Sequence, residues 1–326
     1  MSKHRFLSMS VLCIFLYMLR FPKEVFSGAS QGLLLWFQVV LPTLLPYMII
    51  INLLLLTPAI HWICRFSAPI LSPLLGTSYY GTFAVLTGFL CGYPMGAKTT
   101  SDLLDARKIT RSEASYLLAF CNNTSPAFIL SYVLLQNLKS PDLSLPFLSL
   151  LTLSPVITSF FYRFIYNLRH NDSCNFRKIT PATDSVRPLP NTAAPFESSS
   201  AFFDLCIMNA FESITKIGGY MILFSVIITL LTSLLPDHIF TLILCSSLEI
   251  STGIRLIAAS TLPFWKQLLL CASLTSFGGW CCIAQTQSMI SGNRLPILPY
   301  IAEKLATASV TSLLISAYIY VYSIVN

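Results

Sequence analysis

Charged residues are scarce in this chain. Asp, Glu, Lys and Arg make up only 10% of its 326 residues, against roughly 25% in ordinary soluble domains. Hydrophobic residues make up 55%, and the mean hydropathy is +0.71. A soluble core could not enclose that much apolar surface, and the apolar runs are too long and continuous for a transmembrane β-barrel. The composition predicts an all-α, polytopic integral membrane protein, whose spans must pair every backbone polar group internally.

Motifs for several kinds of chemistry are also missing. The ten cysteines are scattered singly apart from Cys281–Cys282, none forms a CxxC pair, and the four histidines lie far apart. This pattern argues against a disulfide framework and a zinc site. There is no Walker A, GxSxG or HExxH motif. We therefore expect neither ATP-driven nor hydrolytic chemistry, no enzyme activity, no metal and no cofactor.

Apolar runs of about 20 residues mark the candidate spans. They cover residues 5–21, 31–56, 79–97, 114–137, 143–165, 213–236, 238–259, 264–290 and 303–325. Segment 57–78 is interrupted by His61, Arg65 and three prolines, so it is re-entrant, interfacial or a poor span. The pattern predicts about 8–10 transmembrane or re-entrant helices.

The first span has an alternative interpretation as a signal peptide. Its basic start and the small residues Ser27-Gly28-Ala29 fit such a segment, which would then be cleaved. Arg20, Lys23 and Glu24 lie just before that site and argue against cleavage.

A long polar stretch divides the chain. Residues 166–200 are rich in Ser, Asn, Thr and Pro and have no apolar period. We therefore predict an amino-terminal helix and connector (1–30), a first membrane half (31–165), a polar loop (166–212) and a second membrane half (213–326). Basic residues in this loop and in the loop 98–113 place both in the cytoplasm. The net charge of +7 is then a topology signal, so we expect a bilayer partner and no nucleic acid, and leave a homo-oligomer open.

The two halves show a weak internal similarity. Leu86-Thr87-Gly88-Phe89 and Leu274-Thr275-Ser276-Phe277 each precede a glycine-rich bend, a polar turn with an arginine, and a helix containing Leu-Ala. This spacing pairs the helix around Leu118 with the helix around Leu305. It predicts inverted repeats with broken helices that meet near mid-membrane, as in secondary transporters.

One candidate span contains an unexpected polar group. The stretch FCNNTSPAF places Asn122, Asn123, Thr124, Ser125 and Pro126 between two apolar runs. Proline lacks an N–H, and its ring clashes with the carbonyl four residues earlier, so backbone acceptors become free. Because unpaired amides are costly in hydrocarbon, this group must face protein, water or a ligand. We interpret it as a substrate or ion site; the alternative is a proline kink held by interhelical hydrogen bonds.

A glycine-rich stretch predicts a helix that breaks or re-enters. GFLCGYPMGAK contains Gly92, Tyr93, Pro94 and Gly96 and ends at Lys98. Backbone amides exposed by such a break attract anions, and Lys98 would strengthen this attraction. The alternative is close helix packing through small residues.

Two further stretches of the second half complete the set of candidates. SFGGWCCIAQTQS contains Gly278 and Gly279, which permit another break, and the amides of Gln285 and Gln287. LEISTGIR contains Thr252 and Glu249, the latter in an otherwise apolar run. An intramembrane carboxylate is costly, so Glu249 is a candidate to carry a coupling proton or to pair a cation. It could instead pair with Arg255 or lie at the interface.

Four motifs in this order resemble the YlbJ family of sporulation integral membrane proteins. They are TGFLCGYPMGAKTTSDLL, LLAFCNNTSPAFIL, LEISTGIRLI and SFGGWCCIAQTQS, and the resemblance spans roughly 30–325. The family carries the nucleoside-recognition Gate domain, which is similar to part of concentrative nucleoside transporters. Cys91 stands where the family has Ser, and Trp280-Cys281 stands where it tends to have Ser-Val, so the pocket of the second half differs most.

The resemblance implies a role in endospore formation in a bacterial cell membrane, specifically the outer forespore membrane. Family members are thought to move dipicolinate, a flat dianion. We therefore expect a carrier for a small organic anion that works by alternating access. A nucleoside carrier and a non-transporting scaffold for sporulation partners are the alternatives.

Overall fold

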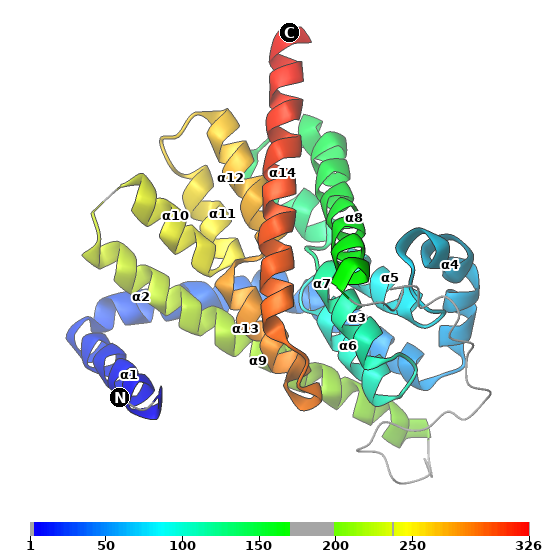
Figure 1. The fold of residues 1–326 in the computed structure, drawn as a ribbon. Helices are drawn as coiled ribbons and strands as arrows, with labels where there is room; N and C mark the ends of the chain where they lie inside the picture. The colour runs from blue at the N-terminus through cyan, green and yellow to red at the C-terminus, as the bar shows by residue number, and fades with distance from the viewer. Residues whose placement is uncertain (1–2, 170–198, 237, 326) are drawn as a thin grey trace.

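The structure, a computed structural model, describes residues 3–169, 199–236 and 238–325. Within these ranges the chain is helical and has no strand, which confirms the all-α prediction. Five helices there are long and apolar enough to cross a bilayer: Pro22–Leu56, Pro141–Phe164, Ala201–Leu234, Phe264–Asn293 and Ile297–Val321. The protein is thus a polytopic membrane protein (Figure 1).

Three of the amino-terminal elements pack along α9 (Ser199–Leu234): α2 (Pro22–Leu35), the π-helical turn η1 (Trp36–Val40) and α3 (Leu41–Leu56). α1 (Lys3–Arg20) precedes them and contacts α2. α2 and α9 approach closely at Gly28, where a Cβ would lie 2.8 Å from the Cα of Val226. The Trp36 indole donates to the Ile214 carbonyl (3.0 Å). Residues 27–29, which the sequence also allowed as a cleavage site, therefore lie inside a helix that packs against the second half.

Two segments fold back on themselves. α5 (Gly81–Cys91) and α6 (Met95–Asp105) pack side by side around the break at Gly92–Pro94, where the sequence predicts one. α10 (Ile239–Leu248) and α11 (Ile250–Ala258) do the same around Glu249. Helices of this length extend about 16 Å, half of the hydrocarbon thickness. Both pairs are re-entrant hairpins. The break in 79–97 agrees with the break or re-entry that its glycines predict, whereas the continuous span predicted at 238–259 is wrong, because that apolar run is interrupted at Glu249.

Two other helices cross the membrane in two pieces. α7 (Arg111–Cys121) is followed by an extended stretch and then by η2 (Phe128–Leu138), and α12 (Phe264–Phe277) turns at Gly278 into α13 (Gly279–Ile290). Thr110 caps α7 because its hydroxyl accepts from the Glu113 amide (3.2 Å). We call α7–η2 and α12–α13 the broken spans.

The remaining elements connect and flank these pieces. They are α4 (Ala59–Leu75), η3 (Pro141–Leu143), α8 (Ser144–Arg169), η5 (Ser291–Asn293) and α14 (Ile297–Val325). α9 begins at Ser199, earlier than the predicted start of the second half at residue 213. Residues 170–198 of the predicted polar loop lie outside the described residues.

Hydrogen bonds between two turns fix the direction of the last helix. Arg111, at the start of α7, donates to the carbonyls of Asn293 (3.0 Å) and Arg294 (2.5 Å), just before α14 begins. α7 and α14 therefore start on the same side of the membrane, which the basic residues of the α6–α7 turn mark as cytoplasmic. The spacing match paired these two helices as inverted equivalents. That pairing is shifted by one membrane-spanning element, because the segment 238–259 does not cross the membrane.

The contacts between helices reveal a different correspondence. Each half contains a hairpin, a broken span and an unbroken helix: α5–α6, α7–η2 and α8 in the first, α10–α11, α12–α13 and α14 in the second. η2 contacts α11 as α13 contacts α6, and α7 contacts α14 as α12 contacts α8. Since the single span α9 separates the two units, one unit is inverted relative to the other.

This topology can be tested by cysteine accessibility in sealed vesicles. We expect a cysteine replacing Thr261 to react with a membrane-impermeant maleimide from the outer face, and one replacing Gly292 to react only from the cytoplasmic face. Both positions are exposed, and a Cβ at Gly292 meets nothing within 4 Å. If 238–259 were one span, the two sides would be exchanged. The parent protein supplies the background from native thiols.

Candidate functional site

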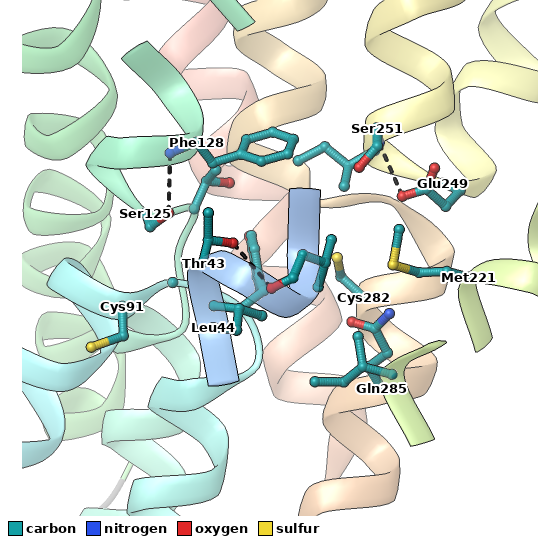
Figure 2. A pocket seen from close by; sticks show the side chains of 16 residues that line it. Thr43, Leu44, Cys91, Ser125, Phe128, Met221, Glu249, Ser251, Cys282 and Gln285 are labelled. Carbon is teal, nitrogen blue, oxygen red and sulfur yellow. Dashed lines mark hydrogen bonds between the residues drawn. The ribbon is translucent and has the colours of Figure 1, made fainter. Parts of the chain in front are cut away.

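The four interrupted elements meet around one cavity of about 60 Å³ (Figure 2). Each hairpin and each broken span contributes side chains, and so do α3 and α9. The lining residues are Val40, Thr43, Leu44, Cys91, Gly92, Tyr93, Thr124, Ser125, Phe128, Ile217, Met221, Glu249, Ile250, Ser251, Cys282 and Gln285. Six residues predicted from the sequence are among them: Gly92, Tyr93, Thr124, Ser125, Glu249 and Gln285.

The tip of the first hairpin is fitted closely to the first broken span. Gly92 has φ +88°, a conformation that L side chains rarely adopt, and a Cβ there would lie 2.7 Å from the Ser125 amide nitrogen. At Gly96 a Cβ would lie 2.6 Å from the Cys121 carbonyl oxygen. The peptide bond between Tyr93 and Pro94 is cis. These glycines let backbone approach backbone, so both the predicted break and the alternative, close packing, apply to this stretch.

The polar stretch of α7–η2 is not helical from Asn122 to Ser125. Pro126 starts the next helical piece, where its missing N–H has no partner to lose. The Ser125 hydroxyl accepts from the Phe128 amide (3.2 Å), and the Thr124 hydroxyl donates to the Thr275 carbonyl of α12 (2.7 Å). The break is thus capped by its own side chains and tied to the other broken span.

Asn122 joins three elements rather than lining the cavity. It is fully buried. Its amide donates to the hydroxyls of Thr286 (2.9 Å) and Tyr300 (3.0 Å), while its oxygen accepts from the Ala97 amide (3.3 Å). All of these partners belong to the protein. Asn122 therefore does what the alternative interpretation predicts: its hydrogen bonds hold neighbouring helices together.

A buried lysine that the sequence did not single out lies next to Asn123. Lys304 of α14 is 0% exposed. Its ammonium donates to the Asn123 oxygen (2.7 Å) and lies 5.2 Å from the centre of the Tyr93 ring. The predicted span began at residue 303, which placed Lys304 at a helix end where charge is ordinary. α14 begins at Ile297 instead, and an ionisable residue inside a span is the signal that would have found it.

Glu249 caps the helix that follows it. Its two carboxylate oxygens accept from the amides of Ser251 (3.0 Å) and Thr252 (2.7 Å) at the start of α11. Arg255 donates to the Gln31 oxygen (2.6 Å) instead. The ion pairs among the described residues are Lys98–Asp102 and Lys216–Glu212, so the suggested pair of Glu249 with Arg255 is not formed. Glu249 is nevertheless buried and lines the cavity.

The other predicted residues lie around the cavity or away from it. Gly278 (φ +84°) makes room for the Tyr93 ring, whose hydroxyl donates to the Ser276 carbonyl (3.1 Å), and Gly279 lies beside it. Lys98 points to the cytoplasmic side, where it contacts Asp102 (2.7 Å) and Asn52 (3.2 Å). Gln287 is exposed.

These features define a class of protein: a multi-pass, all-α membrane protein in which re-entrant hairpins and broken spans enclose a central cavity. In comparison with known proteins, the chain is similar to the sporulation integral membrane protein YlbJ of Bacillus subtilis (strain 168). The two are 24% identical over 315 residues, which cover 87% of this chain and 75% of the relative. This similarity supports the YlbJ family and confirms the resemblance seen in the four motifs. No protein-family model matches the chain, and no solved structure matches it.

The contact between Lys304 and Asn123 can be tested with a double-mutant cycle. We expect Asn123→Ala to lower the free energy of unfolding by about 2 kcal/mol, because it removes a hydrogen bond to a buried charged group. In the Lys304→Met background the same change should cost less, since no ammonium is left without its partner. Thermal unfolding in detergent measures all four proteins. Equal losses in the two backgrounds would show that the two residues are not coupled.

Proposed function

We propose that this protein is a carrier of a small organic anion, with dipicolinate as the leading substrate, that works by alternating access in a membrane of the sporulating cell. The similarity supports the coarser function, a sporulation-associated integral membrane protein. The observation that carries the finer proposal is the convergence of four interrupted helices on one cavity. Secondary transporters bind their substrates at such interruptions.

The groups around the cavity suit a polar, planar ligand. Ser125, Thr124 and Ser251 contribute hydroxyls, and Gln285 contributes an amide that can both donate and accept. The Lys304 ammonium lies 5.2 Å from the centre of the Tyr93 ring, which lines the cavity, so its positive charge lies near the cavity in surroundings where electrostatic attraction is strong. Carboxylates in the cavity would therefore find hydrogen-bond donors and a nearby cation.

Glu249 opposes an anion in the same cavity. Its carboxylate accepts two backbone N–H groups, yet a dianion placed beside it would still be repelled. A proton that enters with the substrate and neutralises Glu249 would remove this repulsion. We therefore assign Glu249 the coupling proton, which makes the proposed carrier a proton symporter.

The size of the cavity supports a moving carrier. A volume of about 60 Å³ holds about four waters, since each needs roughly 15 Å³. A ring that bears two carboxylates needs more room. Binding such a substrate would therefore require the cavity to widen, and we expect the hairpin tips to separate as it enters, as alternating access requires.

A nucleoside carrier is the second candidate, and one observation favours it. The lining residues include no Lys, Arg or His. A neutral ligand that hydrogen-bonds to Gln285 and Glu249 would need no positive counter-charge from the cavity, unlike an anion. The scaffold alternative depends on the loop 166–200, most of which lies outside the described residues.

Uptake into proteoliposomes tests the proposal. We expect labelled dipicolinate to accumulate faster than in empty liposomes, and Gln285→Leu to slow this uptake at least tenfold because a lining amide is lost. Gln287→Leu is the matched control: it changes the same residue type on the same helix, but at an exposed position.

Three outcomes would contradict parts of the proposal. No uptake of dipicolinate above empty liposomes would reject the substrate, and competition by uridine would favour the nucleoside carrier. Equal uptake by Gln285→Leu and the parent protein would show that the cavity is not part of the transport path. In cells, normal spore dipicolinate and normal maturation after deletion of loop 166–200 would argue against the scaffold.

A further inference from the structure

A second cavity of about 440 Å³ lies at the cytoplasmic end of the molecule. Its walls are polar and include Asn52, Lys98, Ser101, Asp102, Asn209 and Lys216. The cavity extends to Gly292, next to the turn where Arg111 contacts Asn293 and Arg294. We call this cavity the vestibule.

Three helices, α3, α9 and α13, line both the vestibule and the central cavity, and α6 lines the vestibule. α3 contacts α6 and α9, and α13 contacts α6 and α9, so the four helices form a ring. On α3, Leu44 lines the central cavity and Asn52 the vestibule; on α13, Gln285 lines the first and Ser288 the second. These separations correspond to about 12 Å along α3 and about 4.5 Å along α13. The two cavities therefore follow one another along these helices, about one to two helical turns apart.

Met48 and Ile217 occupy the layer between the two cavities. Met48 is four residues from both Leu44 and Asn52, so it lies on the same face of α3, between the residues that line the two cavities. It is 0% exposed, and Ile217 on the neighbouring helix α9 is 2% exposed. A methionine side chain is unbranched and changes rotamer at low cost. Such a residue can close a passage without fixing it closed.

Among the residues that the structure describes, the vestibule holds no unpaired cation. Lys98 pairs with Asp102 (2.7 Å), and Lys216 pairs with Glu212 (2.7 Å), while the Asp105 carboxylate accepts from the Asn293 amide (3.2 Å). A substrate anion would therefore bind only weakly to these polar groups, and passage requires binding that is weak enough for release. This gives Lys98 a place on the route although it does not reach the central cavity.

We propose that the ring of α3, α6, α9 and α13 encloses the translocation path, that the vestibule is its cytoplasmic mouth, and that the Met48–Ile217 layer is the cytoplasmic gate. The proposal rests on the proposed transport function, because it names the route to the same cavity. It does not depend on which molecule is carried.

Native thiols provide the test. Cys282 lines the central cavity and is 4% exposed, and Asn209→Cys places a thiol in the vestibule. In inverted vesicles, an impermeant sulfonated maleimide should label Asn209→Cys readily and Cys282 hardly at all. Met48→Ala should then raise the labelling rate of Cys282 at least tenfold. Met208→Ala, at a position 65% exposed on α9, is the matched control and should leave the rate unchanged. Peptide mass mapping identifies the labelled cysteine.

The labelling is independent of any substrate, so it separates the gate from the carrier. If dipicolinate is not transported but Met48→Ala exposes Cys282, the path stands and the substrate is wrong. If Cys282 reacts at the same rate with and without Met48, or if Asn209→Cys does not react from the cytoplasmic side, the proposed path is wrong. Should Met48→Ala fail to fold, Ile217→Ala removes side-chain volume from the same layer, and an unchanged Cys282 rate there overturns the gate equally.

Discussion

A helix that stops halfway across a bilayer leaves amides and carbonyls that no water can satisfy, and the rest of this structure depends on how they are paired. Some breaks are satisfied locally: the Glu249 carboxylate takes the first amides of α11, and Ser125 takes the first amide after its break. Others are satisfied by the opposite half, as when Thr124 and Tyr93 donate to carbonyls of α12. The interruptions can exist only together, which is why they converge at one place.

The sequence locates three of the four interruptions, but it misses the one at Glu249 and does not show how they connect. Composition predicts that the protein lies in a membrane. Gly, Pro and adjacent polar residues predict the breaks at Gly92, Asn122 and Gly278, because they either cannot continue a helix or are costly to bury in an apolar helix. Whether an interrupted run crosses or turns back depends on what lies beside it. Glu249 caps the start of α11 through the amides of Ser251 and Thr252, and the chain turns back after α10 at this point. The sequence does not reveal this, since the same carboxylate could lie within a continuous helix. One such error reverses the direction of every later helix.

The candidate site shows the same limit at the level of side chains. Residue type correctly marked Ser125, Thr124 and Gln285 as polar groups deep in the membrane, and they line the cavity. Asn122 and Lys98 have equally suitable chemistry but point elsewhere, to a neighbouring helix and to the cytoplasmic side. Lys304 was overlooked because helix ends cannot be read from hydropathy to within a turn. Direction and depth come from packing, which a single sequence does not display.

The glycines of the first hairpin have a mechanical consequence. At Gly88 and Gly96 the hairpin touches the backbone of α7 at Cys121, leaving no side chain that could change rotamer between them. Contacts to the second half instead involve side chains, such as the hydrogen bonds from Asn122 to Thr286 and from Tyr93 to Ser276. Side chains can change rotamer, which two backbones in direct contact cannot do. The hairpin and α7 should thus move as one stiff body, and motion between the halves should occur at these side-chain contacts before it bends the body.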